Sequence, residues 1–293
     1  VSRLDATGRI AFPTSIPVEG RPLTMTTGVL GEGLKPKLAV ILDGTGLGPD
    51  GTSWGGEWRE VRGDGSWRRL AHLEPVRLVG GEAAVREPWR VAAAALSAAG
   101  MAADLHRLPL SGTVESGRLE SVAALAGREW PLASGAGRLF EAAGALLGLA
   151  AVNGYEGEAA ARLESLACGA WPAEPWGEVG LLRGDPIPRL PFAGLLAAAA
   201  RRRIGGEDGA RTAAGFHATF CALAADLTWE AAPAGLRIVA LGGGCLVNRL
   251  LREGLSAALS ARGFEVLLPR TVPPGDGGLA YGQAVLACAQ GEA

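Results

Sequence analysis

The stretch LAVILDGTGLGPDGTSWGGEW, residues 38–58, contains the pattern around which the rest of the chain is organised. It opens with a short apolar run, Leu38 to Leu42, which is typical of a buried strand. The apolar run stops at Asp43, where we expect the strand to end. A carboxylate at the end of a buried strand is costly unless it meets a cation or hydrogen-bond donors. Gly44, Thr45 and Gly46 follow, and glycines let backbone N–H groups approach a ligand closely. The stretch therefore predicts either a ligand site or, more simply, an Asp-Gly turn between two strands.

The longer string DGTGLGPDGTSWGGEW, residues 43–58, is more specific than an Asp-Gly turn. It resembles the carbamoyltransferase domain of the hydrogenase maturation factor HypF. More distantly it resembles the nebramycin-type O-carbamoyltransferases and the tRNA threonylcarbamoyladenosine synthases. The resemblance covers roughly Leu38 to the C-terminus, and its later segments occur in the expected order. It implies an α/β fold of the actin-like, sugar-kinase-like (ASKHA) ATPase type, with two lobes around a nucleotide cleft.

The composition bounds the class of protein. The 293 residues include 48% hydrophobic and 20% charged residues, which indicates a globular chain large enough to bury a substantial core. The formal net charge of −2 gives no electrostatic footprint for nucleic acid or for an anionic membrane, so neither partner is expected. No apolar run is as long as a membrane span. The four cysteines are scattered without a CxxC pair, which favours core thiols in a reducing cytoplasm.

Residues 1–37 are rich in Gly, Pro and Thr and show little periodicity, so we expect loops with one hairpin. The HypF-type domain places a histidine motif, HHHAH, just before the DGTG strand, and two of those histidines hold the metal. Here Arg21, Pro22, Leu23 and Met25 stand at those positions, and no histidine precedes His72. The resemblance therefore implies an irregular remnant of the first lobe at 1–37 and a HypF-like carbamoyltransferase domain at 38–293, with the first lobe partial and the second lobe intact.

Two alternating runs from Trp54 to Leu73 flank Gly63-Asp64-Gly65-Ser66, which predicts a hairpin. The following segment is similar to the family's H-L-x-P…GG-[DE]-A…P-x-R. Arg90 or Arg86 could pair with a phosphate or a carboxylate. The simpler interpretation places His72 at the end of a strand and gives the arginines structural or surface roles.

Residues 85–99 and 119–126 have helical patterns, and PLASGAGRLFEAAGALLGL, residues 131–149, follows. Its small-residue loop enters a helix, which makes a ready anion site. Ser134 and Arg138 match the family's SS-x-GRLFDA, whereas Gly135 and Glu141 depart from it. The resemblance puts the acid of this motif near the nucleotide ribose. The alternative is a capped core helix with an outward Arg138.

The string YEGEAA, residues 155–160, begins another predicted helix that ends near Cys168. It resembles the family's YEG-Q-AA, which lies near the nucleotide, although acidic residues in a first helical turn also suit the helix dipole. Residues 169–190 predict a hairpin or an excursion, because they are rich in Pro and Gly. Residues 191–203 and 212–225 predict two further helices.

Residues 236–241 predict a strand, which leads through Gly242-Gly243-Gly244 into a predicted helix over 246–260. A strand, a glycine turn and a helix together form a phosphate- or nucleotide-binding element. With Asn248 the segment resembles the family's GG-VFQN-RLL, although Cys245-Leu246-Val247 is a variant.

Residues 263–268 predict a last strand. The segment PPGDGGLAYGQ, residues 273–283, is close to the family's PPNDGGLALGQ, whose Asp is a metal ligand. Asp276 could equally cap the last helix, and the two roles are compatible.

The predicted site follows from these segments. The candidate metal ligands are Asp43 and Asp276, and no catalytic residue is assigned. The family's metal is zinc or iron, whereas two carboxylates alone form a hard site that suits magnesium. The candidate nucleotide contacts are Gly44, Thr45, Gly46, Ser134, Glu141, Gly243, Gly244 and Asn248.

The resemblance implies that carbamoyl-adenylate, made from ATP and carbamoyl phosphate, sits in the cleft. Its carbamoyl group passes to the C-terminal cysteine thiol of the partner HypE, which begins the nitrile and cyanide ligands of the NiFe hydrogenase centre. A nucleotide and a HypE-like acceptor are thus the expected partners. Two alternatives stay open at this point: a degenerate, non-catalytic nucleotide-binding or docking homologue, and a sugar-kinase-like phosphotransferase.

Overall fold

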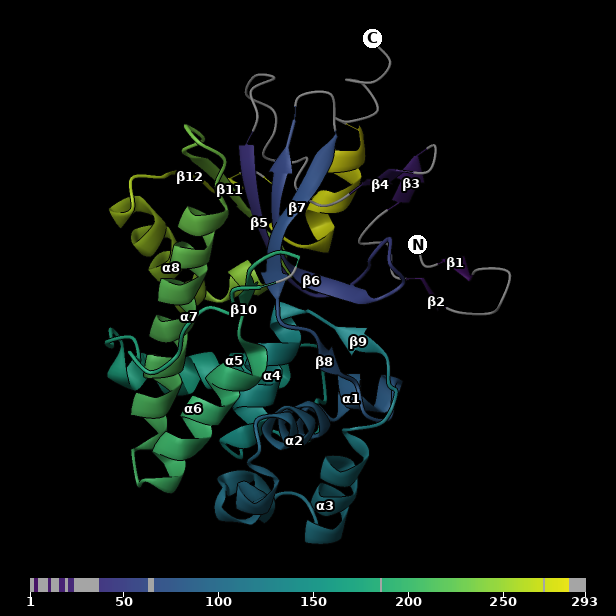
Figure 1. The fold of residues 1–293 in the computed structure, drawn as a ribbon, viewed down its shortest axis with the longest axis vertical. Helices are drawn as coiled ribbons and strands as arrows, with labels where there is room; N and C mark the ends of the chain where they lie inside the picture. The colour runs from purple at the N-terminus through teal and green to yellow at the C-terminus, as the bar shows by residue number, and fades with distance from the viewer. Residues whose placement is uncertain are drawn as a thin grey trace.

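The computed structural model describes residues 37–62, 66–184, 186–270 and 272–284, together with the backbone of four short strands before them (Figure 1). The strands are β1 (Arg3–Leu4), β2 (Ile10–Ala11), β3 (Ile16–Val18), β4 (Arg21–Leu23), β5 (Lys37–Leu47), β6 (Ser53–Val61), β7 (Trp67–Leu73), β8 (Val76–Arg77), β9 (Leu132–Ala133), β10 (Arg189–Leu190), β11 (Ile238–Gly242) and β12 (Glu265–Leu267). The helices are α1 (Glu82–Arg86), α2 (Pro88–Ala98), α3 (Ser116–Leu125), α4 (Ala136–Leu146), α5 (Glu158–Ala167), α6 (Phe192–Ile204), α7 (Gly209–Ala231) and α8 (Arg249–Ala261). The 3₁₀ turns are η2 (Ala102–Arg107), η3 (Pro109–Gly112), η4 (Cys168–Ala170), η5 (Gly244–Val247) and η6 (Asp276–Gly278).

The main sheet has the strand order β10-β7-β6-β5-β11-β12. Strands β5, β6 and β7 form an antiparallel meander, and β11 and β12 continue the sheet parallel to β5. The carboxyl ends of β5 and β11 therefore meet at one edge of the sheet. The mixed α/β architecture is the one expected from the sequence.

Strand β5 lies at the centre of this sheet and is covered on both sides. Leu38, Val40 and Leu42 join the main core, whereas Ala39 and Ile41 pack in a second small cluster. Burial of both faces explains why the strand reads as a continuous apolar run and not as an alternating one.

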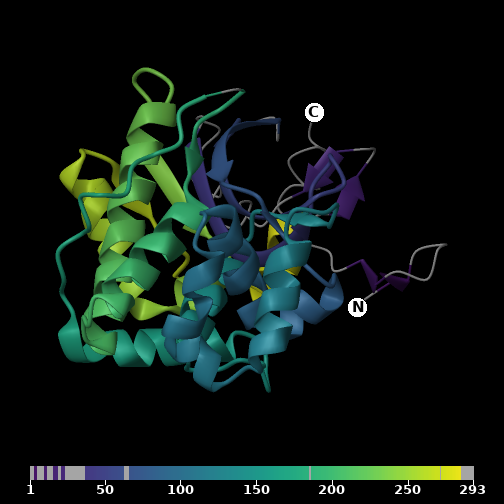
Figure 2. The ribbon, with the colours of Figure 1, turned by 60° about the horizontal axis from the view of Figure 1, so that its bottom comes forward.

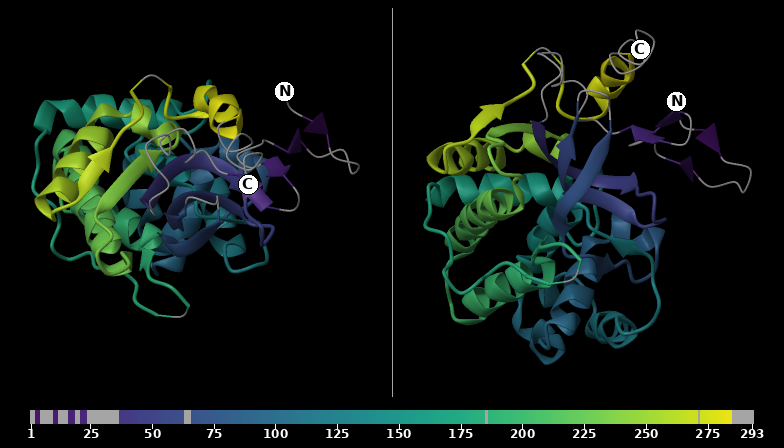
Figure 3. Two further views of the ribbon diagram at one scale, coloured as in Figure 1. Left: turned by 90° about the horizontal axis from the view of Figure 1, so that it is seen from above. Right: turned by 45° about the horizontal axis from the view of Figure 1, so that its top comes forward.

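The helices are distributed unevenly about the sheet. Helices α7 and α8 lie along its side next to β11 and β12, and α2, α4 and α6 form a packed layer beneath it (Figures 1 and 2). The view from above shows β11 and β12 on the side of α8, with the blue strands β6 and β7 on the other side (Figure 3). None of the helices in the described ranges combines the length and the apolar character needed to cross a membrane.

The predicted hairpin between residues 54 and 73 is confirmed by the antiparallel pairing of β6 with β7. Residues 63–65 of its turn lie outside the described residues, but the Arg62 N–H donates to the Ser66 carbonyl at 2.9 Å.

Three predicted boundaries were wrong. The predicted helix over 85–99 is divided into α1 and α2, because Pro88 has no N–H and disfavours a helical conformation for Glu87 before it. Strand β5 does not stop at Asp43; it continues to Leu47 past an irregularity between Leu42 and Gly46. The predicted helix over 246–260 is divided into η5 and α8, with Asn248 between them.

The other predicted elements occur close to their expected positions: α3, α4, α5, α6, α7, β11 and β12. In residues 1–36 the described strands form two short antiparallel pairs, β1 with β2 and β3 with β4. The division of the chain into a first-lobe remnant and a domain over 38–293 stays a prediction. Cys288 lies outside the described residues.

Candidate functional site

A cavity of about 380 Å³ lies at the edge of the sheet where β5 and β11 end. Its wall is formed by the Asp43-Gly44 irregularity, α4, the start of α5, the turn after β11, and η6. A crevice at the carboxyl ends of parallel strands is the usual place for a ligand in an open α/β sheet. We refer to this cavity as the cleft.

Close backbone packing at glycines brings these segments together. Gly243 has φ +102°, and a Cβ atom on it would lie 2.1 Å from the Leu42 carbonyl oxygen. A Cβ on Gly137 would lie 2.8 Å from the Gly44 Cα atom, so the first turn of α4 rests directly on the strand irregularity. The Gly243 N–H donates to the Pro274 carbonyl at 2.9 Å, which ties the turn after β11 to the segment containing Asp276. The sequence requires glycine here for close approach.

Asp43 is the most unusual charge in the cleft. Its Oδ1 accepts a 2.7 Å hydrogen bond from the Gly44 N–H, but its buried Oδ2 has no partner among the described residues. Burial, with a smaller contribution from the negative charge of Asp276, raises the pKa of Asp43 to about 6 against the opposing effect of the Gly44 and Gly244 N–H groups. An unpaired oxygen on a buried carboxylate is a ready ligand for a cation or a proton.

Arg138 and Glu141 form the second charged feature of the cleft. They make a 2.9 Å ion pair one turn apart on α4, and both side chains are almost fully buried. Arg138 also donates to the Val85 carbonyl at 3.2 Å, and Asn153 donates to Glu141 Oε1 at 2.9 Å. Burial raises the pKa of Glu141, and the charge of Arg138 opposes that rise. The alternative with an outward Arg138 was therefore wrong.

The structure brings together only part of the predicted site. The predicted residues that line the cleft are Asp43, Gly44, Glu141, Gly244, Asn248 and Asp276, whereas Thr45, Gly46, Ser134 and Gly243 do not line it.

The four residues outside the cleft have different surroundings, and Gly46 pairs with Trp54 of β6. Ser134 is buried and donates to Glu57 Oε1 at 2.8 Å, while Thr45 is exposed. Gly243 lies behind the cleft wall against the Leu42 carbonyl. Whether the four residues contact a nucleotide stays a prediction.

His72, Arg86 and Arg90, which the sequence singled out, also lie away from the cleft. His72 is buried in β7, where its Nδ1 lies 2.7 Å from the Leu73 carbonyl. Arg90 forms an ion pair with Glu87, and Arg86 is exposed. The structural interpretation of His72 and of Arg90 agrees with these positions.

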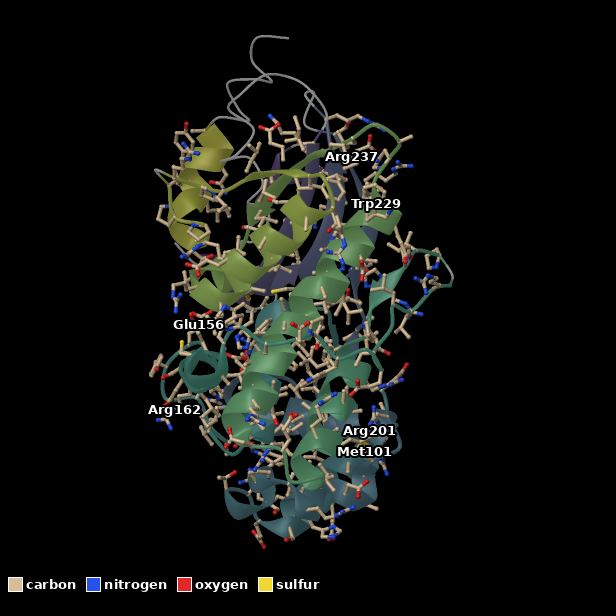
Figure 4. All side chains as sticks on the ribbon, turned by 90° about the vertical axis from the view of Figure 1, so that its left-hand side faces the viewer. Met101, Glu156, Arg162, Arg201, Trp229 and Arg237 are labelled. Carbon is tan, nitrogen blue, oxygen red and sulfur yellow. The ribbon has the colours of Figure 1, made fainter. Side chains whose placement is uncertain are left out.

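Several residues that line the cleft were not among the predicted site residues. Tyr155, Glu156, Glu164, Cys245 and Val247 all line the cleft. The YEGEAA match pointed to the first two, and Glu156 lies at the edge of the molecule beside the start of α5 in Figure 4. Glu164 follows Ala160 and Ala161 at helical spacing on α5, so periodicity could have placed it on the same face.

The charges of the cleft are unbalanced. Five carboxylates line it, from Asp43, Glu141, Glu156, Glu164 and Asp276, against the single guanidinium of Arg138 among its described residues. A phosphate group entering this cleft meets repulsion unless a cation enters with it.

The donor set also tests which metal fits. Within the described residues no group of three His, Cys, Asp or Glu side chains could hold a metal ion. Zinc and iron sites normally use about three protein ligands with imidazole prominent, so the described residues do not complete one. The unpartnered Asp43 Oδ2 and the Asp276 carboxylate do suit magnesium, which keeps several waters and uses one or two carboxylates together with phosphate oxygens.

Comparison with known proteins identifies relatives over almost the whole described region. Residues 39–283 match the family described as "Carbamoyltransferase, Kae1-like Domain, second subdomain". The "Carbamoyltransferase HypF homolog" of Cupriavidus necator is 42% identical over 265 residues, which cover 87% of this chain and 66% of that protein. "Carbamoyltransferase HypF" of Rhizobium leguminosarum bv. viciae is 42% identical over 254 residues, which cover 86% of this chain and 32% of that protein.

Solved structures show the same relationship. A crystal structure of full-length HypF in the phosphate- and nucleotide-bound form matches with a TM-score of 0.78 and 30% identity, over 90% of this chain and 41% of that one. The structure of T. kodakarensis HypF matches with a TM-score of 0.76 and 26% identity, over 92% of this chain and 36% of that one. These matches confirm the expected ASKHA-type fold. The chain spans about two thirds of the Cupriavidus relative and about a third of the Rhizobium one.

Proposed function

The chain belongs to the HypF carbamoyltransferase family, in the second subdomain of its Kae1-like domain, and from that membership we propose that its cleft binds carbamoyl-adenylate for carbamoyl transfer. The proposed acceptor is a cysteine thiol of a HypE-like partner protein, in the maturation of NiFe hydrogenase. The alternative of a non-catalytic homologue is not favoured, because relatives up to 42% identical are named carbamoyltransferases. We propose a cytoplasmic location, on the scattered cysteines without a CxxC pair.

The observation that carries the proposal is the pair of carboxylates, Asp43 and Asp276, beside the backbone of Gly44 and Gly244. An unpartnered buried oxygen at the edge where β5 and β11 end is what a cation–phosphate complex would complete. Bound there, a divalent ion would neutralise phosphate charge and polarise phosphate or carbonyl oxygens.

Other residues of the cleft suit the base and the ribose of the nucleotide, and so they would fix its orientation. Tyr155, Ala160, Val247 and Leu251 supply an apolar portion that suits a planar base, and Val247 is 72% exposed at the rim. Glu141 is held by Arg138 and Asn153, so it presents a fixed carboxylate that suits ribose hydroxyls.

The excess of carboxylates favours a ligand with little phosphate charge. An acyl-adenylate has one phosphate with a single negative charge, whereas ATP has three phosphates. We therefore expect this cleft to prefer carbamoyl-adenylate over ATP, most clearly when divalent cations are scarce. The role of this chain's own residues is to bind and orient that adenylate.

The test supplies synthetic carbamoyl-adenylate and a cysteine-terminated peptide to the full 293-residue chain. Mass spectrometry then measures carbamoyl addition to the thiol. We expect transfer above the uncatalysed rate, lost in Asp43→Asn and in Asp276→Asn. We also expect slow turnover, because no histidine precedes His72 to match the family's metal motif. Binding of the adenylate with no transfer at all would support the non-catalytic alternative instead.

A further inference from the structure

Asn248 joins the turn after β11 to helix α8. We call residues 243–248 the wall turn, because Gly244, Cys245 and Val247 within it line the cleft. The Oδ1 atom of Asn248 accepts a buried 2.9 Å hydrogen bond from the Leu251 N–H, so Asn248 is the N-cap of α8. Its Nδ2 lies 3.0 Å from Nε2 of His217, also in a buried contact. Both ends of the amide therefore bind inside the protein.

His217 determines which way this amide points. The ring is fully buried in α7, and its Nδ1 lies 2.8 Å from the Ala213 carbonyl. A carbonyl oxygen can only accept, so Nδ1 carries the proton and Nε2 is left as an acceptor. Asn248 must then present its NH₂ group to Nε2 and its oxygen to the Leu251 N–H. The opposite orientation would face donor to donor and acceptor to acceptor.

The imidazole of His217 packs against two aromatic rings and is neutral at ordinary pH. Phe140 and Phe216 meet it edge-on, with centroid distances of 5.2 and 6.2 Å. Burial lowers the pKa of His217 to about 4, so the ring is neutral near pH 7. The acceptor that Asn248 requires is thus present under ordinary conditions.

We propose that His217, which does not line the cleft, is a positioning residue that holds the wall turn in its ligand-binding shape through Asn248. The proposal rests on the proposed function of the cleft, and it changes the role of Asn248 from a nucleotide contact to a link between α7 and the wall turn. When the link is cut, the N-cap loses its fixed orientation, and Gly244, Cys245 and Val247 become free to shift.

The experiment uses the full chain with three substitutions in α7 and the wall turn. His217→Leu removes the acceptor, and His217→Gln replaces the ring with an amide that can both accept and donate. Asn248→Ser keeps a capping oxygen but is too short to reach His217. The matched control is Thr228→Val, which removes the 2.8 Å acceptor of Trp58 Nε1 from the same buried helix, at a hydroxyl whose hydrogen bonds go to Trp58 and Ala224.

The first readout needs no ligand. Cys245 lies in the wall turn, and its thiol is alkylated with N-ethylmaleimide and quantified by mass spectrometry, with the exposed Cys168 as an internal reference. We expect His217→Leu and Asn248→Ser to raise the rate at Cys245 by about tenfold, as the loss of one buried hydrogen bond implies. His217→Gln should stay within about threefold of the wild type.

The second readout is the affinity for ATP with magnesium, measured by calorimetry on the same proteins. We expect the same two variants to weaken it by about tenfold and Thr228→Val to leave it unchanged. An unchanged Cys245 rate in His217→Leu would overturn the proposal, as would an equal rise in Thr228→Val, which would indicate general loosening. If the wild type binds no ATP, the proposed nucleotide function fails for this chain, while the alkylation rates still decide the positioning role.

Discussion

Two carboxylates on neighbouring strands of one sheet have opposite surroundings. Glu57 on β6 is 1% exposed and is bound by Arg69 through contacts of 2.6 and 3.0 Å, with a third hydrogen bond from Ser134. Asp43 on β5 is also largely buried, but one of its oxygens has no partner among the described residues. The first arrangement stabilises the sheet, whereas the second leaves a charge for a ligand to complete. Burial alone does not mark a functional carboxylate; an unmet oxygen beside a cleft does.

The largest effect is expected where the paired carboxylate loses its partner. Arg69→Leu takes both guanidinium hydrogen bonds from the buried Glu57, which keeps the Ser134 hydrogen bond and the charge of Arg59, and it removes the guanidinium that stacks 3.8 Å from the Trp54 ring centroid. Breaking a buried pair in this way costs about 3–5 kcal/mol of unfolding free energy. Chemical denaturation at pH 7 measures it.

The control for this substitution is Arg107→Leu, whose ion pair with Asp104 is exposed and should contribute less than about 1 kcal/mol. Equal losses in the two variants would contradict a structural role for the Glu57–Arg69 pair.

Adjacent glycines behind and within the cleft give the second contrast. Gly243→Ala places a Cβ 2.1 Å from the Leu42 carbonyl at a φ of +102°, so the backbone must shift. We expect a loss of about 2–4 kcal/mol in unfolding free energy from the strain and the overpacking together. In Gly244→Ala the Cβ would lie 3.3 Å from Asp43 Oδ1, inside the cleft.

Gly244→Ala should therefore unfold within about 1 kcal/mol of the wild type but bind ATP with magnesium more weakly. Thermal unfolding and calorimetry on both variants test the distinction. The reverse pattern, with Gly243→Ala stable and Gly244→Ala unfolded, would show that the turn is positioned differently.

The sequence predicted the sheet and its hairpin because the apolar runs and glycine turns are local signals. Strand β5, the β6–β7 hairpin and the strand–turn–helix at β11 each follow from periodicity and turn chemistry. The partnerships of the buried charges could not be predicted in this way. Ser134 binds Glu57 across 77 residues, and Asn248 binds His217 across 31, so neither contact leaves a local pattern.

For the same reason the predicted site mixed two kinds of residue. Ser134 and Gly243 are close in sequence to residues that line the cleft. Ser134, however, donates to Glu57 in the sheet, and Gly243 packs against the Leu42 carbonyl. The motif match located the region correctly, since Asp43, Gly244 and Asp276 do line one cleft. Which atoms face the ligand depends on side-chain packing, which only the three-dimensional structure shows.

The pH dependence of the unfolding free energy is expected to have opposite signs at His72 in the sheet and at Asp43 in the cleft. Burial and the charge of Arg69 lower the pKa of His72 to about 4, below the ordinary value of about 6.5. A depressed folded pKa means that the unfolded chain binds the proton more readily. Above pH 6.5 the ring is neutral in both states and has no pH-dependent effect, and as the pH falls towards 4 protonation of the unfolded chain lowers the stability by about 3 kcal/mol at most.

We expect His72→Gln to remove that dependence, since glutamine can still donate to the Leu73 carbonyl without taking up a proton. Unfolding free energies at several pH values between 7 and 4 provide the measurement. His217 has a pKa lowered in the same direction and should keep part of the acid sensitivity in this variant. Identical pH profiles for the variant and the wild type would refute the assignment to His72.

The smallest expected effect lies at Asp43 and has the opposite sign. Its pKa is raised to about 6 from an ordinary 3.8, so the folded chain binds the proton more readily, and stability falls as the pH rises through this range. Asp43→Asn keeps an oxygen for the Gly44 N–H and removes the unpaired charge. At pH 8 with a chelator present, this variant should be more stable than the wild type by on the order of 2 kcal/mol, and the gain should vanish near pH 3.5. The sign control is Asp50→Asn: hydrogen bonds from Thr52 and Trp54 lower the pKa of Asp50, and an amide NH₂ in place of Oδ2 would face the Trp54 Nε1–H donor to donor, so this variant should be less stable than the wild type. Addition of magnesium and ATP should then stabilise the wild type and not Asp43→Asn. A variant less stable than the wild type at pH 8 would mean that Asp43, like Glu57, has a partner that stabilises its charge.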